Sequence, residues 1–280
     1  MSSFFRLAGM ARPHAALRKP LSTTFFSTTA AKRPLPPNFY KQLSPSMVSK
    51  LKQPRSYSSG FGPQRQYGAN MFLLKGLIGV NLAVWGYGTY ALAQAKEGHA
   101  GNYIKFMHNM TMNLAEFKRG YYWQALTSMF THQDFFHIGA NLFTFWYLGR
   151  GLAAMPVTPG QFMFIVLGSG LSGSLLWLTQ QEQKLQAGNG NTRQRGLGFS
   201  GALLGAMTVL ACFEPRSTVQ LYGIIPVPLG LIVLGYAAYD GYYLHSENSR
   251  VAHAGHLGGL AFGLAYYFLK LRRLRFPGSL

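Results

Sequence analysis

Two side chains that could do chemistry, Ser200 and His256, lie in strongly apolar stretches of this 280-residue chain. Ser200 stands in a Gly-Phe-Ser-Gly sequence over residues 198–201, where an apolar run begins, and His256 opens a His-Leu-Gly-Gly sequence inside a later run. A histidine in hydrocarbon is costly and normally faces a bundle interior or a water-filled cavity. A serine hydroxyl becomes a useful nucleophile when an imidazole about 3 Å away accepts its proton. The two residues therefore predict a Ser200–His256 dyad and proteolysis within a bilayer.

Two further polar residues could stabilise the oxyanion that acyl transfer generates. His137 and Asn141 stand four residues apart, so they share one face of a helix. Their side chains, together with the backbone N–H of Ser200, are candidate hydrogen-bond donors to that oxyanion. Taken singly, His137 could equally be a packing or interfacial histidine, and Asn141 a hydrogen-bond partner of a neighbouring helix.

Other titratable side chains have weaker claims to a catalytic role. His132 stands just outside an apolar run and is predicted to be structural, whereas His253 is a rival base that we expect nearer the surface. Asp240 stands toward the end of another run, so we expect no carboxylate as a third catalytic member, and packing must orient His256. Cys212, the single cysteine, is expected to be a small buried hydrophobe. No metal or cofactor is predicted.

Six apolar segments could place these residues in a membrane, since about 20 mostly apolar residues cross a hydrocarbon core. Consecutive spans alternate in direction, so the starts of the second, fourth and sixth emerge on one membrane face. The four candidate residues lie near these starts and can converge at similar depth, which favours the oxyanion role. The long first loop is expected to carry short interfacial helices. The approximate limits of the six spans are 71–95, 135–154, 161–179, 197–214, 227–245 and 251–270.

The composition indicates an all-α polytopic membrane protein. Hydrophobic residues make up 48% of the chain and charged residues only 12%, too few charges for a soluble protein of this length. The net charge of +19 is uneven, since residues 1–70 hold 11 Lys and Arg and no acidic residue. Nucleic-acid binding is not expected, because many basic residues lie in a Ser-, Thr- and Pro-rich leader rather than on a folded face with aromatic partners.

Residues 1–57 have the composition of a mitochondrial transit peptide, rich in Arg, Lys, Ser and Thr and without acidic residues or a secretory apolar core. A generic disordered basic tail is the alternative. We expect a transit peptide over 1–57, a linker over 58–70, a six-helix domain over 71–270 and a basic tail over 271–280. The basic tail favours termini in the matrix, which directs the site toward the intermembrane space.

Together the motifs resemble those of the rhomboid family of intramembrane serine proteases over residues 71–270. The Gly-Phe-Ser-Gly sequence is similar to the family's nucleophile motif, which implies Ser200 as nucleophile. His256, with glycines three and seven residues later, resembles the sixth-helix motif and implies a general base. His137 and Asn141 resemble the second-helix oxyanion motif. The resemblance implies a six-transmembrane-helix rhomboid-like bundle with a long first loop, of the mitochondrial type.

Three positions depart from the family's pattern. Trp123 is followed by Gln124 where the first loop of the family has a Trp-Arg pair, and Gly255 stands where an alanine often precedes the histidine. Leu204 replaces a tyrosine that packs on the histidine in many bacterial members. These departures leave open how the first loop is anchored and how the imidazole is oriented.

The resemblance implies a serine endopeptidase of the mitochondrial inner membrane that cuts single-span membrane proteins near a helix end. Its surroundings would be the lipid bilayer, and it would need no cofactor. Two alternatives stay open: a rhomboid-like pseudoprotease that binds membrane clients, and an unrelated polytopic carrier whose intramembrane histidines relay ions. The carrier should tolerate loss of Ser200. The sequence does not determine the natural substrate, the cleaved bond or the oligomeric state.

Overall fold

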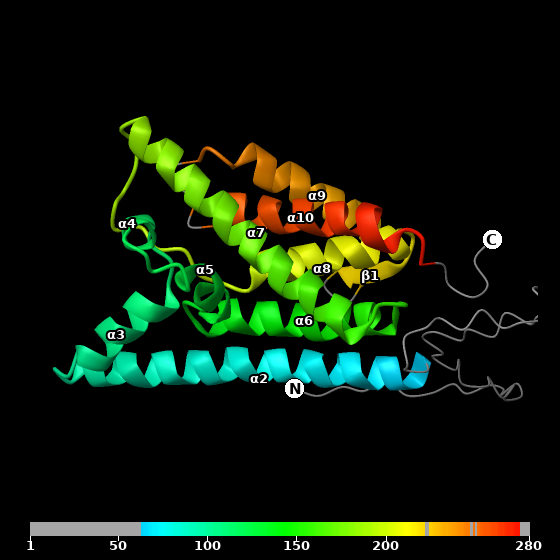
Figure 1. The fold of residues 1–280 in the computed structure, drawn as a ribbon, viewed down its shortest axis with the longest axis horizontal. Helices are drawn as coiled ribbons and strands as arrows, with labels where there is room; N and C mark the ends of the chain where they lie inside the picture. Colours follow the sequence, from blue (N-terminus) through cyan, green and yellow to red (C-terminus); the bar gives the residue numbers. More distant parts are fainter. Residues whose placement is uncertain (1–62, 222–223, 247–248, 250, 275–280) are drawn as a thin grey trace, which may run out of the picture. The chain divides into compact units, whose positions relative to one another are not determined.

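The computed structural model describes residues 63–221, 224–246, 249 and 251–274, all within one compact unit. Within them, six helices lie where the six apolar segments predicted them (Figure 1). The predicted transit peptide and residues 275–280 of the predicted tail lie outside the described residues. The six helices are α2 (Pro63–Lys96), α6 (Phe135–Ala154), α7 (Pro159–Gln186), α8 (Ser200–Phe213), α9 (Leu229–Tyr242) and α10 (His253–Tyr266), which continues as the π-helical turn η3 (Tyr267–Leu271).

Short helices occupy the long first loop, as the sequence predicted. They follow α2 and lead into α6, which begins the second predicted span at residue 135. The helix α2 itself starts eight residues before the predicted first span, within the segment that we assigned to a linker. The short helices are α3 (Gly101–Met110), α4 (Leu114–Lys118), α5 (Gln124–Thr127) and the 3₁₀ turn η2 (Ser128–Phe130).

Two of the described helices are long and apolar enough to cross a membrane by length and composition, namely residues 64–96 of α2 and the whole of α7. The helix α8 is apolar but has only 14 residues, which rise about 21 Å. A hydrocarbon core is about 30 Å thick. The described chain is therefore mostly helical with helices suited to a membrane, while the count of six spans stays a prediction.

Side-chain caps fix where the helices on either side of the α6–α7 connection begin. Asp134 precedes α6, and its carboxylate accepts the N–H of His137 at 2.8 Å. Thr158 and Gln161 form a reciprocal capping box at the start of α7, with Pro159 at the first helical position. The first turn of α6, which carries His137, is thus held by a local hydrogen bond.

Glycines allow α8 and α10 to pack backbone to backbone at the centre of the bundle, with α7 crossing beside them (Figure 1). A Cβ added to Gly259 would lie 2.0 Å from the carbonyl oxygen of Gly201. One turn further on, a Cβ on Gly263 would lie 2.4 Å from the carbonyl oxygen of Gly205. No larger residue fits at these contacts, so the glycine spacing sets the distance between the two helices.

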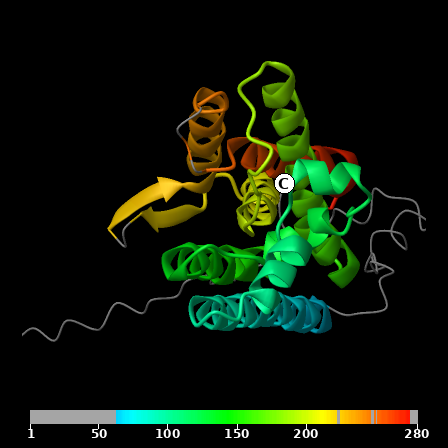
Figure 2. The same ribbon diagram turned by 90° about the vertical axis from the view of Figure 1, so that its left-hand side faces the viewer.

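The expectation of a purely helical fold was wrong between α8 and α9. There β1 (Thr218–Leu221) pairs antiparallel with β2 (Ile225–Pro228), in a register that sets Val219 opposite Val227. Figure 2 shows this hairpin projecting from the side of the helical bundle. The strands are four residues long and rich in β-branched residues, which favour strands. Runs this short between two helices carry too little periodicity to be recognised as strands.

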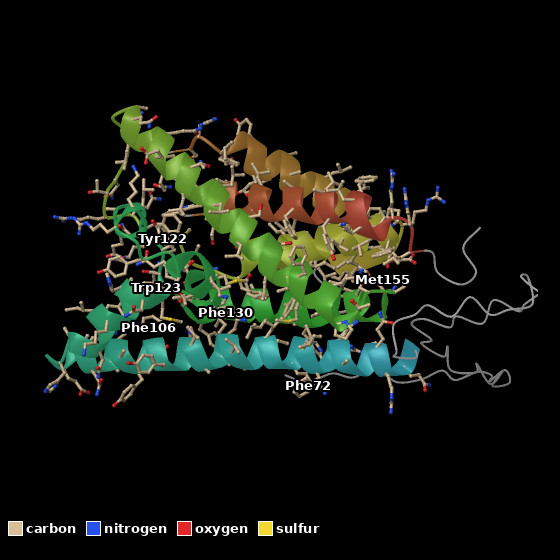
Figure 3. All side chains as sticks on the ribbon, viewed as in Figure 1. Phe72, Phe106, Tyr122, Trp123, Phe130 and Met155 are labelled. Carbon is tan, nitrogen blue, oxygen red and sulfur yellow. The ribbon has the colours of Figure 1, made fainter. Side chains whose placement is uncertain are left out.

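Large apolar side chains are exposed on the outer faces of the helices. Phe72 on α2 is 77% exposed and points away from the bundle (Figure 3). Large exposed apolar side chains in this number favour a membrane or protein interface. Other side chains of this class are Val80, Tyr90, Phe136, Phe143, Leu234, Tyr242 and Leu269.

Candidate functional site

Ser200 and His256 meet in the structure although 56 residues separate them in the chain. Ser200 is the first residue of α8, and His256 lies in the first turn of α10. The Ser200 Oγ lies 2.8 Å from the His256 Nε2, which is hydrogen-bonding distance. The glycine contacts between α8 and α10 permit this approach, so the dyad geometry follows from the packing of the two helices.

The turn before α8 presents Ser200 to the cleft. Gly198 adopts a φ of +121°, which L side chains rarely adopt, and its N–H donates to the carbonyl of Ser128 at 3.0 Å. Phe199 is completely buried, and its ring contacts that of Phe145 edge-on at 4.8 Å between centroids. The N–H of Ser200, at the first helical position, has no acceptor within its own helix. The same helix terminus favours negative charge.

His137 and Asn141 lie on the face of α6 that borders Ser200. The Nδ1 of His137 accepts the N–H of Gln133 at 3.4 Å, so the Nε2 carries the hydrogen in the neutral ring. That Nε2 lies toward Gly198, where an added Cβ would be only 3.2 Å away from it. The Asn141 amide donates one hydrogen to the carbonyl of His137 at 2.8 Å and keeps a second hydrogen. Both side chains therefore retain a donor for a ligand.

All four predicted site residues line one cleft with a volume of about 680 Å³. The helices α2 and α3 form another part of its wall. The cleft combines a nucleophile, a base and several hydrogen-bond donors, which is the equipment that acyl transfer requires. Other lining residues are Trp85, Thr89, Tyr103, Phe106, Trp177 and Val251.

A carboxylate contacts His256, contrary to the prediction that packing alone would orient the ring. The Nδ1 of His256 lies 3.1 Å from each carboxylate oxygen of Asp240, which is completely buried near the end of α9. The end of an odd-numbered span and the start of the next one emerge on the same face. The alternation of spans that aligned His137 with Ser200 could therefore also have placed Asp240 at this level.

His253 is not the surface-proximal rival base that the sequence suggested. Its side chain is only 3% exposed, and both ring nitrogens already have partners. The Nδ1 lies 2.6 Å from Asp240 Oδ1, and the Nε2 lies 2.7 Å from Ser249 Oγ. With both nitrogens engaged on the far side of Asp240, His253 does not compete with His256 for the Ser200 proton.

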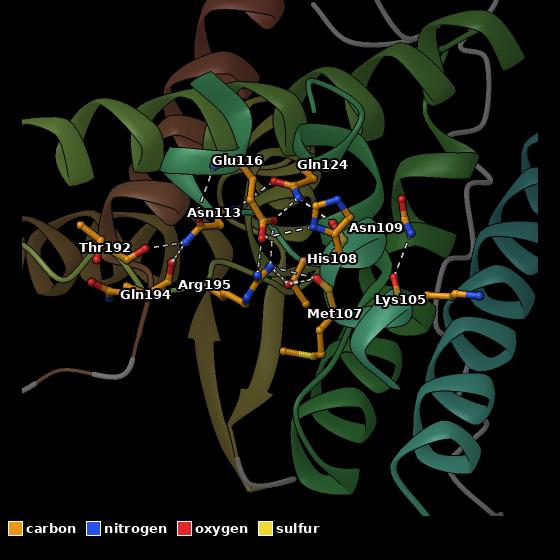
Figure 4. A network of polar contacts seen from close by, with 11 residues as sticks. Lys105, Met107, His108, Asn109, Asn113, Glu116, Gln124, Thr192, Gln194 and Arg195 are labelled. Atoms are coloured by element: carbon orange, nitrogen blue, oxygen red, sulfur yellow. Dashed lines mark hydrogen bonds and ion pairs between the residues drawn. The ribbon is translucent and has the colours of Figure 1, made fainter. Parts of the chain in front are cut away.

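Gln124 anchors the first loop together with an arginine from the segment that leads to Ser200 (Figure 4). The buried Gln124 amide donates to Glu116 Oε2 at 2.6 Å, and its oxygen accepts the N–H of Asn113 at 3.1 Å. The guanidinium of Arg195 donates to both oxygens of Glu116, at 2.5 and 3.1 Å, and to Thr111 Oγ1 at 3.0 Å. A guanidinium is thus present in the loop network, but residue 195 supplies it rather than residue 124.

Glu116 is held ionised within this network. Burial on its own raises the pKa of the Glu116 carboxyl. Hydrogen bonds from Arg195, Gln124 and His108, together with the charge of Arg195, outweigh that effect and leave the pKa below its usual range. The backbones of Met112 and Gly196 exchange two hydrogen bonds beside it, at 2.9 and 2.8 Å. The first loop and the segment that leads to Ser200 are therefore joined by side-chain and backbone hydrogen bonds.

His132 lies buried beside the cleft in the loop before α6. Its side chain is 6% exposed, and within the described residues neither ring nitrogen has a hydrogen-bond partner. Burial, and then the adjacent His137 ring at 5.0 Å between centroids, lower the pKa of His132 to about 4. The ring is therefore neutral near pH 7, and the structural role of His132 stays a prediction. No cluster of three or more potential metal ligands occurs in the part of the chain that the structure describes.

The family to which this fold and cleft belong follows from comparison with known proteins. The rhomboid domain matches residues 119–273, which is more than half of the chain and includes α6 to α10. The chain therefore belongs to the rhomboid family, whose members are typically serine proteases acting on membrane proteins.

Two curated relatives are mitochondrial rhomboid proteins. The RHOMBOID-like protein 12, mitochondrial, of Arabidopsis thaliana is 30% identical over 178 residues, covering 61% of this chain and 52% of the relative. The Rhomboid protein 1, mitochondrial, of Saccharomyces cerevisiae is 33% identical over 146 residues, covering 50% of this chain and 39% of the relative. The chain thus spans about half or less of the length of the curated relatives that it matches.

Proposed function

We propose that this chain is an intramembrane serine protease that hydrolyses peptide bonds in or near transmembrane segments of single-span membrane proteins. Ser200 is the nucleophile and His256 the general base. The observation that carries the proposal is the 2.8 Å approach of Ser200 Oγ to His256 Nε2, in a cleft that also holds hydrogen-bond donors. Membership of the rhomboid family supports the same chemistry.

In the acylation step, the Ser200 Oγ attacks the carbonyl carbon of the scissile peptide while its proton passes to His256 Nε2. The resulting oxyanion accepts hydrogen bonds from the Ser200 N–H, the His137 Nε2–H and the free amide hydrogen of Asn141. As the tetrahedral intermediate collapses, the C–N bond breaks and His256 returns the proton to the leaving amine. Water then attacks the acyl-enzyme by the same route in reverse, which releases the second product.

Several features of the cleft suit a membrane-protein substrate. The exposed apolar faces of the outer helices favour a surrounding bilayer, in which single-span substrates diffuse laterally. The polar side chains around Ser200 provide a place for the water that hydrolysis consumes. The ion pair of Glu116 with Arg195 keeps the first loop against the Ser200 segment, so the wall of the cleft is preorganised.

The site of action that we propose is the mitochondrial inner membrane, with the cleft open to the intermembrane space. The supporting observations are the acid-free leader over residues 1–57 and the similarity to mitochondrial rhomboid proteins. Fusion of residues 1–60 to a fluorescent protein tests the leader. Mitochondrial fluorescence is expected, and cytosolic fluorescence would contradict import.

Cleavage of a single-span reporter in proteoliposomes tests the activity directly. The wild type should cut the reporter, whereas Ser200→Ala and His256→Ala should each lose at least about 1,000-fold in rate. A fluorophosphonate probe should label the wild type and not Ser200→Ala. Equal cleavage by all three proteins would end the protease assignment. Absence of both cleavage and labelling in the folded wild type would instead favour a client-binding pseudoprotease or a carrier.

A further inference from the structure

We propose that Asp240 is a positioning residue for His256, and that His253 and Ser249 in turn hold the Asp240 carboxylate. The five side chains form one line of hydrogen-bonding contacts, from Ser249 through His253, Asp240 and His256 to Ser200. The inference rests on the proposed protease function. It extends the Ser200–His256 dyad to a triad with Asp240.

The contact with Asp240 determines which ring nitrogen of His256 carries the hydrogen. In a neutral imidazole one nitrogen donates and the other accepts. To take the Ser200 proton, Nε2 must carry the lone pair, so Nδ1 must carry the hydrogen and needs an acceptor. The Asp240 carboxylate offers two oxygens, each 3.1 Å from that Nδ1. The contact therefore selects the productive tautomer and fixes the plane of the ring.

His253 helps to stabilise the buried charge of Asp240. An ionised carboxylate that is completely buried is costly unless it is hydrogen-bonded. His253 Nδ1 lies 2.6 Å from Oδ1 and gives the carboxylate a second donor besides His256. Within the described residues these two rings, both on α10, are the titratable groups that touch Asp240. Two imidazoles on α10, the helix that carries the proposed base His256, therefore hydrogen-bond the Asp240 carboxylate.

Ser249 and two tyrosine rings keep His253 in place. Ser249 Oγ accepts the N–H of Val251 at 3.2 Å and lies 2.7 Å from His253 Nε2. An ionised carboxylate can only accept, so in the neutral ring Nδ1 carries the hydrogen toward Asp240 and Nε2 accepts the hydroxyl hydrogen of Ser249. The rings of Tyr239 and Tyr243 flank His253, at 5.7 and 5.8 Å between centroids. The donor that faces Asp240 thus has a fixed direction.

The arrangement explains the departure at position 204. A tyrosine packs on the histidine in many bacterial rhomboids, whereas Leu204 is a buried aliphatic residue of α8 and offers no aromatic face. In this chain the opposite edge of the imidazole is bound by a carboxylate from α9. When His256 takes the Ser200 proton, the carboxylate also stabilises the imidazolium that forms.

Kinetics on reconstituted full-length variants test the inference. Asp240→Asn should lower kcat about 100-fold to 10,000-fold with little change in KM, because the amide can present its NH₂ to Nδ1 and favour the wrong tautomer. Loss of the negative charge should also move the acidic limb of the pH–activity profile to lower pH. The matched control is Glu97→Gln, an exposed carboxylate in the turn after α2, which should keep wild-type rates and profile.

His253→Phe provides a second, independent readout because it leaves Asp240 in place. Without its His253 donor, the carboxylate should act more strongly on His256 and move the acidic limb in the opposite direction, to higher pH. His253→Gln, which can still donate to Asp240, should restore most of the wild-type profile. A merely structural role for either residue would lower the amount of folded protein and leave the limb unmoved.

The outcomes separate this inference from the proposed function. If Ser200→Ala is inactive while Asp240→Asn keeps the wild-type kcat and pH profile, the protease stands and the positioning role is wrong. If Ser200→Ala still cleaves, the proposed function itself fails. Thermal unfolding in detergent checks that each variant is folded. Should Asp240→Asn not fold, the profile of His253→Phe decides, since an unshifted limb there overturns the inference.

Discussion

At the scale of single residues, the conformation of Gly198 connects the backbone to the chemistry. Its positive φ turns the chain into α8 so that Ser200 begins the helix, and its missing side chain leaves space for His137. A Cβ at this position would lie 3.1 Å from the Cε1 of His137. The same glycine therefore serves the nucleophile and one proposed oxyanion donor.

Gly198→Ala should reduce reporter cleavage at least ten-fold in a protein that still folds. The alanine adds about 1–2 kcal/mol of backbone strain and displaces His137 from the place where it would meet the oxyanion. The measurement is kcat/KM in proteoliposomes. The matched control is Gly139→Ala on α6, where an added Cβ meets no atom within 4 Å and activity should be unchanged. Wild-type activity in Gly198→Ala would contradict the assignment of His137.

His132 should make the folded state less stable as the pH falls. Its pKa is about 4 in the folded protein and near 6.5 when unfolded, so between these values the unfolded chain binds a proton that the folded chain does not. The contribution of the neutral His132 to the free energy of unfolding is fully present above pH 6.5. It is lost as the pH falls toward 4, by up to about 1.4 kcal/mol per pH unit.

Thermal unfolding in detergent between pH 7.5 and 4.5 measures this effect. His132→Gln should show a shallower decline than the wild type, whereas Gln in place of the exposed His99 should decline like the wild type. The same slope in His132→Gln and the wild type would show that His132 does not titrate as the burial implies.

At the scale of secondary structure, the contact between α8 and α10 decides whether serine and histidine meet. Gly259→Ala should therefore impair both folding and cleavage. The added Cβ would stand 2.0 Å from the Gly201 carbonyl oxygen, and a shift of about 1 Å between the helices can cost about 100-fold in rate. Gly255→Ala, one turn earlier on α10, is the control, because its Cβ would be 3.6 Å from the nearest atom.

Thermal unfolding and reporter cleavage should fall together in Gly259→Ala and stay near wild type in Gly255→Ala. The same test addresses the departure from the family pattern at position 255, since alanine fits there without displacement. Loss of activity in Gly255→Ala equal to that in Gly259→Ala would mean that the glycine contacts do not explain the packing.

The ion pair between the first loop and the α7–α8 connection should contribute measurably to stability. A double-mutant cycle with Glu116→Gln and Arg195→Gln should give a coupling free energy of about 1–3 kcal/mol, because both side chains are largely buried and the pair is bidentate. The more exposed pair of Lys118 with Glu182 is the matched comparison and should give a smaller coupling free energy. Equal coupling free energies in the two cycles would show that the Glu116–Arg195 pair does not anchor the first loop.

At the scale of the whole molecule, the two ends of α8 should face opposite sides of the inner membrane. In a chain whose Cys212 is replaced by alanine, a cysteine at the exposed Arg193 should react with an impermeant maleimide in mitoplasts. A cysteine at the exposed Arg216, beyond the other end of α8, should react only after the membrane is dissolved. The reverse pattern would place the cleft on the matrix side.

Much of the site was predictable because the signals are local. The apolar runs indicated all six helices, and the alternation of the predicted spans aligned Ser200 with three other residues: His256, His137 and Asn141. Gly201 and Gly205 on α8, and Gly259 and Gly263 on α10, recur four residues apart, a spacing typical of closely packed membrane helices, and the two helices approach closely at these positions. The β1–β2 hairpin was missed because two four-residue strands leave almost no periodic pattern.

By itself, the sequence determined which residues could do chemistry and that they stand near the starts of apolar runs, since hydrophobic runs and short motifs depend on neighbours along the chain. Only the tertiary structure decided what supports them. The contacts of Asp240 with His253 and His256, and of Arg195 with Glu116, join separate elements, and the second pair is 79 residues apart. Such pairs depend on how helices and loops pack, because a buried charge takes whichever partner the fold brings within hydrogen-bonding distance.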